Sequence, residues 1–419
     1  MRMFQRWQIV VWVALVLATA QVEADPQRDR RWQEDLRYLA TELPKRHVKP
    51  FRVASLETFE AAANKLLAEI PQLEDHQIVV RMAQLVALIG DAQTRLNPAE
   101  HAYKAHYVPI GFFWFNDGLR VTAARQADLH LLGARLERIG GMAIDEVVAK
   151  AGTVVGQENE LVLKRAAPLL INNVEVLHGV GIIAGLDAVE YTLTLRDGTE
   201  KVVRFEAMPM QDRARYVEPT DLPGVEPPLY LRAVREQYWM KYLDEARALY
   251  VQYNDPREKK ERPFTAFVEE LFRLVDEKSP ERLIIDVRHN DGTNSTVANP
   301  LIQRIQGDER FRERGRLFVI IGRETSSAGM MNAMQLGGLC GAILVGEATG
   351  GRPNNYGEIQ ATTLPNSGYT VTYTTHFWEV RPGDIKATLR PDVLAEPTYE
   401  ALAAGRDPAL EACLSWKKP

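Results

Sequence analysis

The run "LFVIIGRETSSAGMMNAM" (residues 317–334) decides how the second half of this chain is interpreted. Its first five residues are apolar and favour a buried strand, which stops at Gly322. Two serines and a threonine follow, and then a segment rich in Ala, Met and Leu that is typical of a helix. The hydroxyl of Ser327 is therefore expected at the mouth of a helix, as that helix's cap or as a reactive group.

Alternating strand and helix signals continue on both sides of this run. A helix-like stretch covers residues 264–277, and buried-strand runs cover residues 248–254, 283–287 and 342–347. This alternation predicts an α/β core with largely parallel strands. Because parallel strands end at the same edge of a sheet, we expect the loop "RHNDGTNS" (288–295) to lie beside the Ser327 turn.

The first half of the chain has a different pattern. Apolar residues at intervals of three and four predict helices at 30–43, 56–70 and 76–90. Short strands follow up to Glu206, and the stretches 133–148 and 191–206 are similar to parts of a PDZ module. A connector rich in proline and glycine (217–228) comes next. The expected organisation is a signal peptide over residues 1–24, a helical N-terminal region over 25–104, a PDZ-like domain over 105–210, a connector over 211–245 and an α/β core over 246–419.

The N-terminus is typical of an export signal. Arg2 and Arg6 precede the apolar run 9–20, and "VEA" (22–24) supplies small residues for cleavage near Ala24. As a helix, this apolar run spans only about 18 Å, which is short of the roughly 30 Å hydrocarbon core of a bilayer. We therefore expect an exported protein, periplasmic or secreted, with no stable membrane span after cleavage.

Composition argues against several partners and cofactors. The chain has 51 Lys and Arg against 56 Asp and Glu, a net charge of −5 and no long basic run, so nucleic acid is not expected as a partner. The two cysteines, Cys340 and Cys413, are interpreted as small buried hydrophobes, and a disulfide between them is left open. Their spacing suggests no metal site, and no other cofactor is predicted.

Taken alone, "TSSAG" (325–329) fits a structural helix cap, since serine and threonine are preferred there. Its setting resembles the tail-specific (C-terminal processing) serine peptidase family, which is related to the tricorn core and the interphotoreceptor retinoid-binding protein repeats. The resemblance is carried, in order, by "LVALIGDAQTRL" (85–96), "LYVQYN" (249–254), "LIIDVRHNDGTNS" (283–295), "IGRETSSAG" (321–329), "ILVGEATGGRPNNYGE" (343–358) and "WEVRPGDIKATLRPDV" (378–393). It implies a crotonase/ClpP-like α/β core with an inserted PDZ-like domain.

Carried over position by position, the resemblance implies peptide-bond hydrolysis through an acyl-enzyme on Ser327. The amide of Ala328, and that of Gly292 or Thr293, match the oxyanion donors of the family. Losing one such donor typically lowers the rate by a factor of roughly a hundred to a thousand. Thr293 stands where the family usually has a second glycine, and its side chain can narrow the oxyanion site.

Both customary bases are replaced in this chain. One branch of the family uses a lysine 25 residues after the nucleophile, and Arg352 stands there, which stays protonated and cannot act as a base. The other branch uses a histidine in a "GDGHT"-like segment, which reads "GDAQT" here with Gln93 at the histidine position. The substitute bases considered are His289, His376 and Asp384, and a structural role is the simpler interpretation of each histidine.

Three functions are compatible with this pattern. The first is a serine peptidase that cuts peptides or unfolded protein segments, with its usual base replaced; the retained "TSSAG" favours it. The second is a catalytically weakened or inactive pseudopeptidase that binds peptide tails, which Gln93 and Arg352 favour. The third is an acyl hydrolase for a small ester or thioester, and no coenzyme A pocket is recognised to support it. Cleavage preference and oligomeric state are left open.

Overall fold

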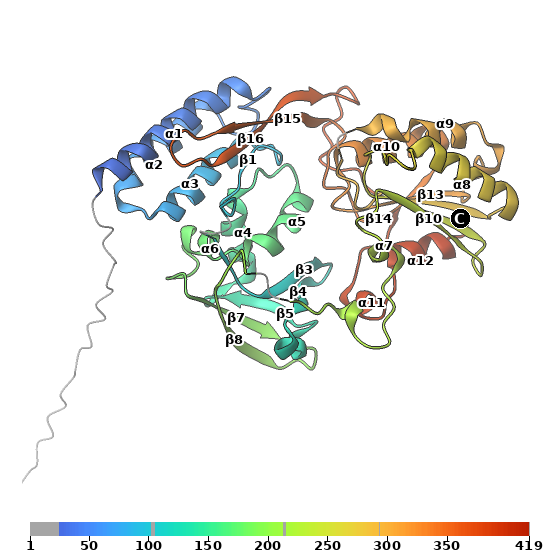
Figure 1. Ribbon diagram of the computed structural model, residues 1–419, viewed down its shortest axis with the longest axis horizontal. Helices are drawn as coiled ribbons and strands as arrows, with labels where there is room; N and C mark the ends of the chain where they lie inside the picture. The colour runs from blue at the N-terminus through green and yellow to red at the C-terminus, as the bar shows by residue number, and fades with distance from the viewer. Residues whose placement is uncertain (1–24, 102–104, 213–214, 293, 419) are drawn as a thin grey trace, which may run out of the picture.

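The structure, a computed structural model, describes residues 25–101, 105–212, 215–292 and 294–418. The expected signal peptide (1–24) and Thr293 lie outside the described residues. Figure 1 shows the N-terminal helices at one end of the molecule, the C-terminal region of strands and helices at the other end, and the middle region with its own sheet between them. Within the described ranges, no helix is long and apolar enough to cross a membrane.

Three helices form the N-terminal region, as predicted: α1 (Pro26–Arg46), α2 (Leu56–Glu69) and α3 (Asp75–Ala87). Asp25 and Ser55 accept hydrogen bonds from first-turn amides and so cap the first two helices. Leu36, Leu39 and Leu43 recur at helical spacing along α1 and are buried. This apolar stripe fixes the face of α1 that packs into the core of the N-terminal and middle regions.

The middle region is built on an antiparallel sheet with the strand order β3–β4–β5–β7–β8. These strands are β3 (Ile110–Phe115), β4 (Gly118–Ala124), β5 (Arg135–Ile139), β7 (Ala188–Thr194) and β8 (Glu200–Glu206). Two short pairs flank them: β5 pairs with β6 (Met142–Ala143), and β2 (His106–Tyr107) pairs with β9 (Met208–Pro209). Between β6 and β7 the chain forms α4 (Ile144–Ala151), α5 (Glu160–Leu170) and α6 (Val174–Gly179). The predicted strands are confirmed, while the PDZ-like assignment stays a prediction.

The C-terminal region holds a second sheet, with the strand order β10–β11–β12–β13–β14–β17. Its strands are β10 (Tyr238–Leu243), β11 (Ala248–Tyr253), β12 (Arg282–Asp286), β13 (Leu317–Ile321), β14 (Ile343–Gly346) and β17 (Val393–Leu394). All neighbours from β11 to β17 are parallel, and β10 is antiparallel to β11. The predicted α/β architecture with largely parallel strands is confirmed, and the crotonase/ClpP-like assignment stays a prediction.

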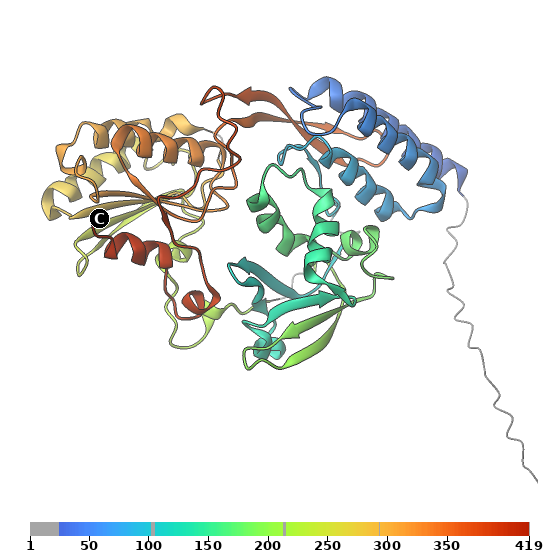
Figure 2. The ribbon, with the colours of Figure 1, turned by 180° about the vertical axis from the view of Figure 1, so that it is seen from behind.

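Helices cover both faces of this second sheet, as Figure 2 shows from behind. On the face that carries Leu283 and Ile285 lie α8 (Phe264–Lys278), α9 (Asn299–Gln306) and α10 (Ser327–Cys340). On the face that carries Ile284 lies α12 (Pro408–Ser415), and two short helices complete the region, α7 (Leu229–Arg232) and α11 (Tyr399–Ala403). Because both faces are buried, the strands need apolar residues on both faces, which is why the sequence shows long apolar runs in place of strict alternation.

A long hairpin leaves the C-terminal region and returns to the N-terminal helices (Figure 1). It consists of β15 (Asn355–Thr363) and β16 (Thr370–Trp378), and β16 pairs with β1 (Arg95–Leu96) in a three-stranded sheet. The expected boundaries therefore need two corrections. β10 lies in the predicted connector (211–245) but belongs to the C-terminal sheet, and the hairpin lies in the predicted core (246–419) but pairs with the N-terminal region.

The two cysteines lie on opposite faces of the C-terminal sheet. Cys340 packs with the apolar cluster under α8, α9 and α10, and Cys413 is fully buried in the cluster under α12. Both are free thiols. The sheet separates them, so the disulfide left open by the sequence does not form in this fold.

Candidate active site

Ser327 begins helix α10, directly after the turn that follows β13. The cap of this helix is the preceding residue, Ser326, whose side chain makes no capping hydrogen bond. The backbone of Ser327 has a φ of 46°, in the left-handed region that a residue other than glycine occupies at a cost of about 1–3 kcal/mol. The interpretation of Ser327 as the helix cap is therefore wrong. A strained, half-buried serine at a strand-to-helix turn is instead typical of a nucleophile.

The Ser327 turn is held against the loop that follows β12. Ser326 donates its amide to the carbonyl of Asn290 (3.1 Å). A Cβ atom on Gly329 would lie 2.2 Å from the Asn290 carbonyl oxygen, so only glycine permits this close approach. The two strand tips thus lie side by side, as the parallel arrangement predicts, and Ser327 is adjacent to the loop at 290–292.

The amides predicted to hold an oxyanion have partners inside the protein. Ala328 donates its N–H to the carbonyl of Gly292 (2.8 Å), and Gly292 donates its N–H to the side-chain oxygen of Asn290 (3.3 Å). Thr293, the alternative donor, lies outside the described residues. The structure brings Ala328 and Gly292 together beside Ser327, with both amides occupied. The carbonyl of a substrate therefore has to displace the Gly292 carbonyl before it can accept a hydrogen bond from the amide of Ala328.

The loop after β14 closes a third side of the site. Gly351 donates its amide to the carbonyl of Thr325 (3.1 Å), and a Cβ atom on Gly351 would lie 3.4 Å from the amide nitrogen of Ser327. Arg352 follows directly and is half-buried. Its Nε atom is buried without a hydrogen-bond partner among the described residues. Arg352, which stands at the position of the family's lysine base, therefore lies next to the serine and carries an unsatisfied hydrogen-bond donor.

Gln93 lies in the short loop between α3 and β1. Its amide donates to Asp91 (2.9 Å), and its carbonyl accepts the hydroxyl of Thr372 on β16 (2.7 Å). The side chain of Asp91 is fully buried and also contacts Nε2 of His47 (3.2 Å) and the hydroxyl of Thr374 (2.8 Å). Burial raises the pKa of Asp91, but the hydrogen bonds from His47 and the other donors outweigh burial, so the net pKa is lowered. Asp91 is therefore an ionised carboxylate at neutral pH.

Glu158 lies against the Gln93 loop, although it belongs to the middle region. Its carboxylate accepts the amide of Ala92 (3.1 Å). Burial raises the pKa of Glu158 from its usual 4.5 to about 7; repulsion from Asp91 adds to this effect, and the positive charge of Arg352 opposes it. A carboxyl group that titrates near neutrality, beside both altered base positions, is suited to accept and return a proton.

Side chains from the start of α5 dock the middle region onto the loops around Ser327. Asn159 caps α5 and donates its side-chain amide to the carbonyls of Gly350 (2.9 Å) and Ala387 (2.8 Å). Further along the same helix, Arg165 pairs with Asp291 (3.0 Å). These contacts place Glu158 and the Gln93 loop at the same edge of the C-terminal sheet as the serine.

The substitute bases considered from the sequence make contacts of other kinds. His289 bonds through Nδ1 to Glu324 (2.8 Å) and lines a cavity in which Ser327 has no part. His376 is exposed on β16 beside a tryptophan. The carboxylate of Asp384 accepts a hydrogen bond from the backbone amide of Lys386 in its own turn. Among these contacts within the described residues, none links these groups to the serine.

Comparison with known proteins identifies the fold. No protein-family model and no curated protein sequence matches the chain. Among solved structures, mature CPAF complexed with lactacystin aligns with 92% of this chain and 97% of its own at 11% identity, with a TM-score of 0.61. Mature CPAF alone aligns with 92% of this chain and 96% of its own at 12% identity, also with a TM-score of 0.61.

The photosystem II D1 C-terminal processing protease aligns with 90% of this chain and 98% of its own at 16% identity, but its TM-score of 0.39 is too low to carry an argument. CPAF is a tail-specific (S41) peptidase, and its likeness to this chain confirms the resemblance predicted from the sequence. At such low identities the likeness to CPAF establishes the fold alone. The chain has the fold of the tail-specific serine peptidases.

Proposed function

We propose that the protein is an exported serine peptidase that hydrolyses peptide bonds through an acyl-enzyme on Ser327. The observation that carries the proposal is the convergence on one strained serine of the loops after β12, β13 and β14. The middle region brings a carboxyl group of near-neutral pKa, that of Glu158, to the same edge. This arrangement supplies a hydroxyl, main-chain donors and a titrating group in one place.

In the proposed reaction, the Ser327 hydroxyl attacks the substrate carbonyl carbon while its proton passes through a water beside Gln93 to the carboxylate of Glu158. The resulting oxyanion takes the place of the Gly292 carbonyl on the amide of Ala328. Glu158 then returns the proton to the leaving amine, which departs as the C–N bond breaks. A water molecule attacks the acyl-enzyme by the same route, releases the acid product and restores the serine.

Arg352 fits this scheme as a fixed positive charge. It lowers the pKa of Glu158 and so keeps more of the carboxylate form at neutral pH, against burial and the charge of Asp91. A lysine at this position in the family accepts the proton itself. An arginine cannot, so the charge and the proton acceptor are divided between Arg352 and Glu158.

The substrates proposed are peptides or unfolded protein segments. The middle region, which we assign as PDZ-like, is anchored beside the serine by Asn159 and Arg165, so a peptide tail bound there lies near the candidate site. A signal peptide over residues 1–24 directs the chain out of the cytoplasm. Nucleic acid is not a partner in this proposal.

Cleavage of unstructured peptides by the mature protein tests the proposal. Wild type is expected to cleave slowly, Ser327→Ala to lose the activity, and Gln93→His to raise it by restoring the base of the other family branch. Correct folding of each variant is checked by circular dichroism. If wild type and Ser327→Ala cleave at the same rate, Ser327 is not the nucleophile and the peptidase proposal fails.

A pseudopeptidase that binds peptide tails is the second candidate. Two observations favour it: the amide of Ala328 is occupied by Gly292, and neither Gln93 nor Arg352 can act as a base. Binding of labelled peptide tails, measured by fluorescence polarisation, separates the two functions. Tight binding with no cleavage that depends on Ser327 would establish this alternative in place of the first.

A further inference from the structure

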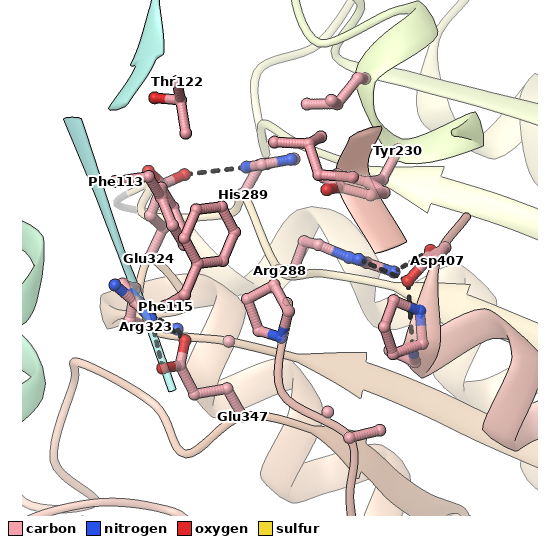
Figure 3. A pocket seen from close by; sticks show the side chains of 18 of the residues that line it. Phe113, Phe115, Thr122, Tyr230, Arg288, His289, Arg323, Glu324, Glu347 and Asp407 are labelled. Atoms are coloured by element: carbon pink, nitrogen blue, oxygen red, sulfur yellow. Dashed lines mark hydrogen bonds and ion pairs between the residues drawn. The ribbon is translucent and has the colours of Figure 1, made fainter. Parts of the chain in front are cut away.

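A cavity of about 300 Å³ lies between the middle region and the C-terminal sheet, apart from the serine (Figure 3). Phe113 and Phe115 of β3 and Thr122 of β4 form one wall. Tyr230 of α7 and residues at the ends of β12, β13 and β14 form the other. Ser327 is not among the lining residues, so the cavity is a place for a ligand distinct from the candidate active site.

The cationic side chains of this cavity are paired with carboxylates of its own wall. Arg323 and Glu347 form a buried ion pair (2.6 Å), and Arg288 pairs with Asp407 (2.7 Å). Glu218 is exposed at the rim, where its side chain caps a short turn. Because these positive charges are already paired with carboxylates, the cavity offers no strong attraction to an anion.

His289 is the polar group of the cavity that stays unsatisfied. Its Nδ1 atom lies 2.8 Å from the carboxylate of Glu324, and a carboxylate accepts hydrogen bonds. The proton shared in this bond therefore belongs to Nδ1. The Nε2 atom is buried without a partner among the described residues, and in the neutral ring it is a hydrogen-bond acceptor.

An aromatic ring lies against the imidazole of His289. The ring of Tyr230 stacks on that of His289 with a centroid separation of 5.9 Å. Figure 3 shows the imidazole between Glu324 and Tyr230, with Phe113 on the opposite side of the cavity. A planar aromatic ligand can cover these faces, and a donor on its edge can satisfy the histidine.

We propose that this cavity binds a small, neutral aromatic molecule that donates an N–H or O–H group to Nε2 of His289. Such a ligand contacts β3 and β4 on one side and the tips of the C-terminal sheet on the other. It therefore joins the two regions that also meet at the candidate active site. The proposal is independent of catalysis by Ser327, because it concerns binding alone.

Indole and 1-methylindole are matched probes for this donor, since they differ by one methyl group that replaces the N–H hydrogen. Isothermal titration of the mature full-length protein is expected to give a Kd for indole at least about tenfold lower than that for 1-methylindole. Indole-3-carboxylate, which adds a negative charge, is expected to bind more weakly than indole. Equal affinities for indole and 1-methylindole, or no measurable binding of indole, would overturn the proposal.

Two variants locate the binding. His289→Phe keeps an aromatic ring but removes Nε2, so the preference for indole is expected to disappear, and Thr122→Trp fills the cavity and is expected to weaken both probes. His376→Phe is the matched control, because this histidine is exposed on β16. Circular dichroism checks the fold of each variant. If His289→Phe keeps the same preference as His376→Phe, or if indole still binds Thr122→Trp unchanged, the assigned site is wrong.

Discussion

Two clusters of buried charge near the tips of the C-terminal sheet are satisfied to different degrees. In the first, Arg288 makes two hydrogen bonds to Asp407 (3.0 and 2.7 Å) and one to Asp286 (3.0 Å). In the second, the pKa of Glu158 is raised to about 7, and the Nε atom of Arg352 has no partner among the described residues. The first cluster is fully paired, whereas the second carries one unsatisfied donor and a carboxyl group of raised pKa.

This difference indicates different roles. The two hydrogen bonds from the guanidinium of Arg288 fasten the β12 tip to the start of α12, as expected of a structural ion pair. Glu158 contacts the Gln93 loop at the edge of the sheet where the strained serine lies, and its raised pKa of about 7 lets it exchange a proton near neutral pH, as expected of a group that takes part in chemistry. A fold usually avoids unsatisfied donors and carboxyl groups of raised pKa. Where it keeps both, as in the second cluster, the site is a candidate for function.

The largest expected effect is on activity, in the second cluster. Glu158→Gln removes the proposed proton acceptor while keeping its size and an oxygen for the amide of Ala92. We expect kcat/KM for peptide cleavage to fall by about 10²–10⁴-fold. Glu160→Gln, at an exposed carboxylate two residues further on, is the control and is expected to be active. Equal activity in the two variants would remove Glu158 from the mechanism and leave the role of Ser327 to be judged separately.

The next largest effect is on stability, in the first cluster. Asp407→Asn leaves the buried guanidinium of Arg288 short of a counter-charge, and we expect the free energy of unfolding to fall by about 3–5 kcal/mol. Glu411→Gln breaks an exposed pair with Arg406 and should cost about 1 kcal/mol or less. Urea unfolding measures both. Similar losses in the two variants would contradict the structural role assigned to the first cluster.

A smaller effect concerns the pH dependence of stability. Because the pKa of Glu158 is raised from 4.5 to about 7, the folded state holds this proton more tightly than the unfolded chain, so its contribution to stability is lost as the pH rises between these values. Glu158→Gln removes this loss. Above pH 7 the variant should be more stable than wild type by about 1–3 kcal/mol, with little difference at pH 4. An equal difference at both pH values would mean that Glu158 does not titrate as described.

The smallest expected effect is on stability and comes from the backbone strain at Ser327. Glycine adopts a φ of 46° freely, whereas serine and alanine do not. Ser327→Gly is therefore expected to be more stable than Ser327→Ala by about 1 kcal/mol, although glycine disfavours a helix and both variants lack the hydroxyl. Thermal unfolding compares the two. A more stable alanine variant would show that the backbone at this turn is not strained.

The sequence predicts the elements close to the serine well, because local patterns determine them. An apolar run that ends at Gly322 marks β13, and this strand is predicted residue for residue. The helix cap was assigned one position too late, at Ser327 and not Ser326, because adjacent serines satisfy the same preference. Gly329 and Gly351 permit the close approach of neighbouring loops, a role that the motif suggests only when the fold is known.

Features that depend on distant parts of the chain could not be predicted. The pairing of β16 with β1 joins segments almost three hundred residues apart, as in the pair of Arg95 with Thr372, and no local pattern encodes it. Glu158 carries no motif, and its raised pKa arises from burial and from Asp91, which lies in another region. The His47–Asp91 contact is likewise a product of the fold. The sequence therefore indicates the nucleophile and the loss of both usual bases, but not what replaces them.

The most direct test of the account is the rate at which a fluorophosphonate labels Ser327, followed by mass spectrometry across a range of pH. In wild type, this rate is expected to rise as the pH passes through about 7, where Glu158 becomes able to accept the serine proton. Glu158→Gln is expected to react slowly and without that rise. Absence of label on Ser327, or the same pH profile in both proteins, would contradict the claim that this carboxylate activates this serine.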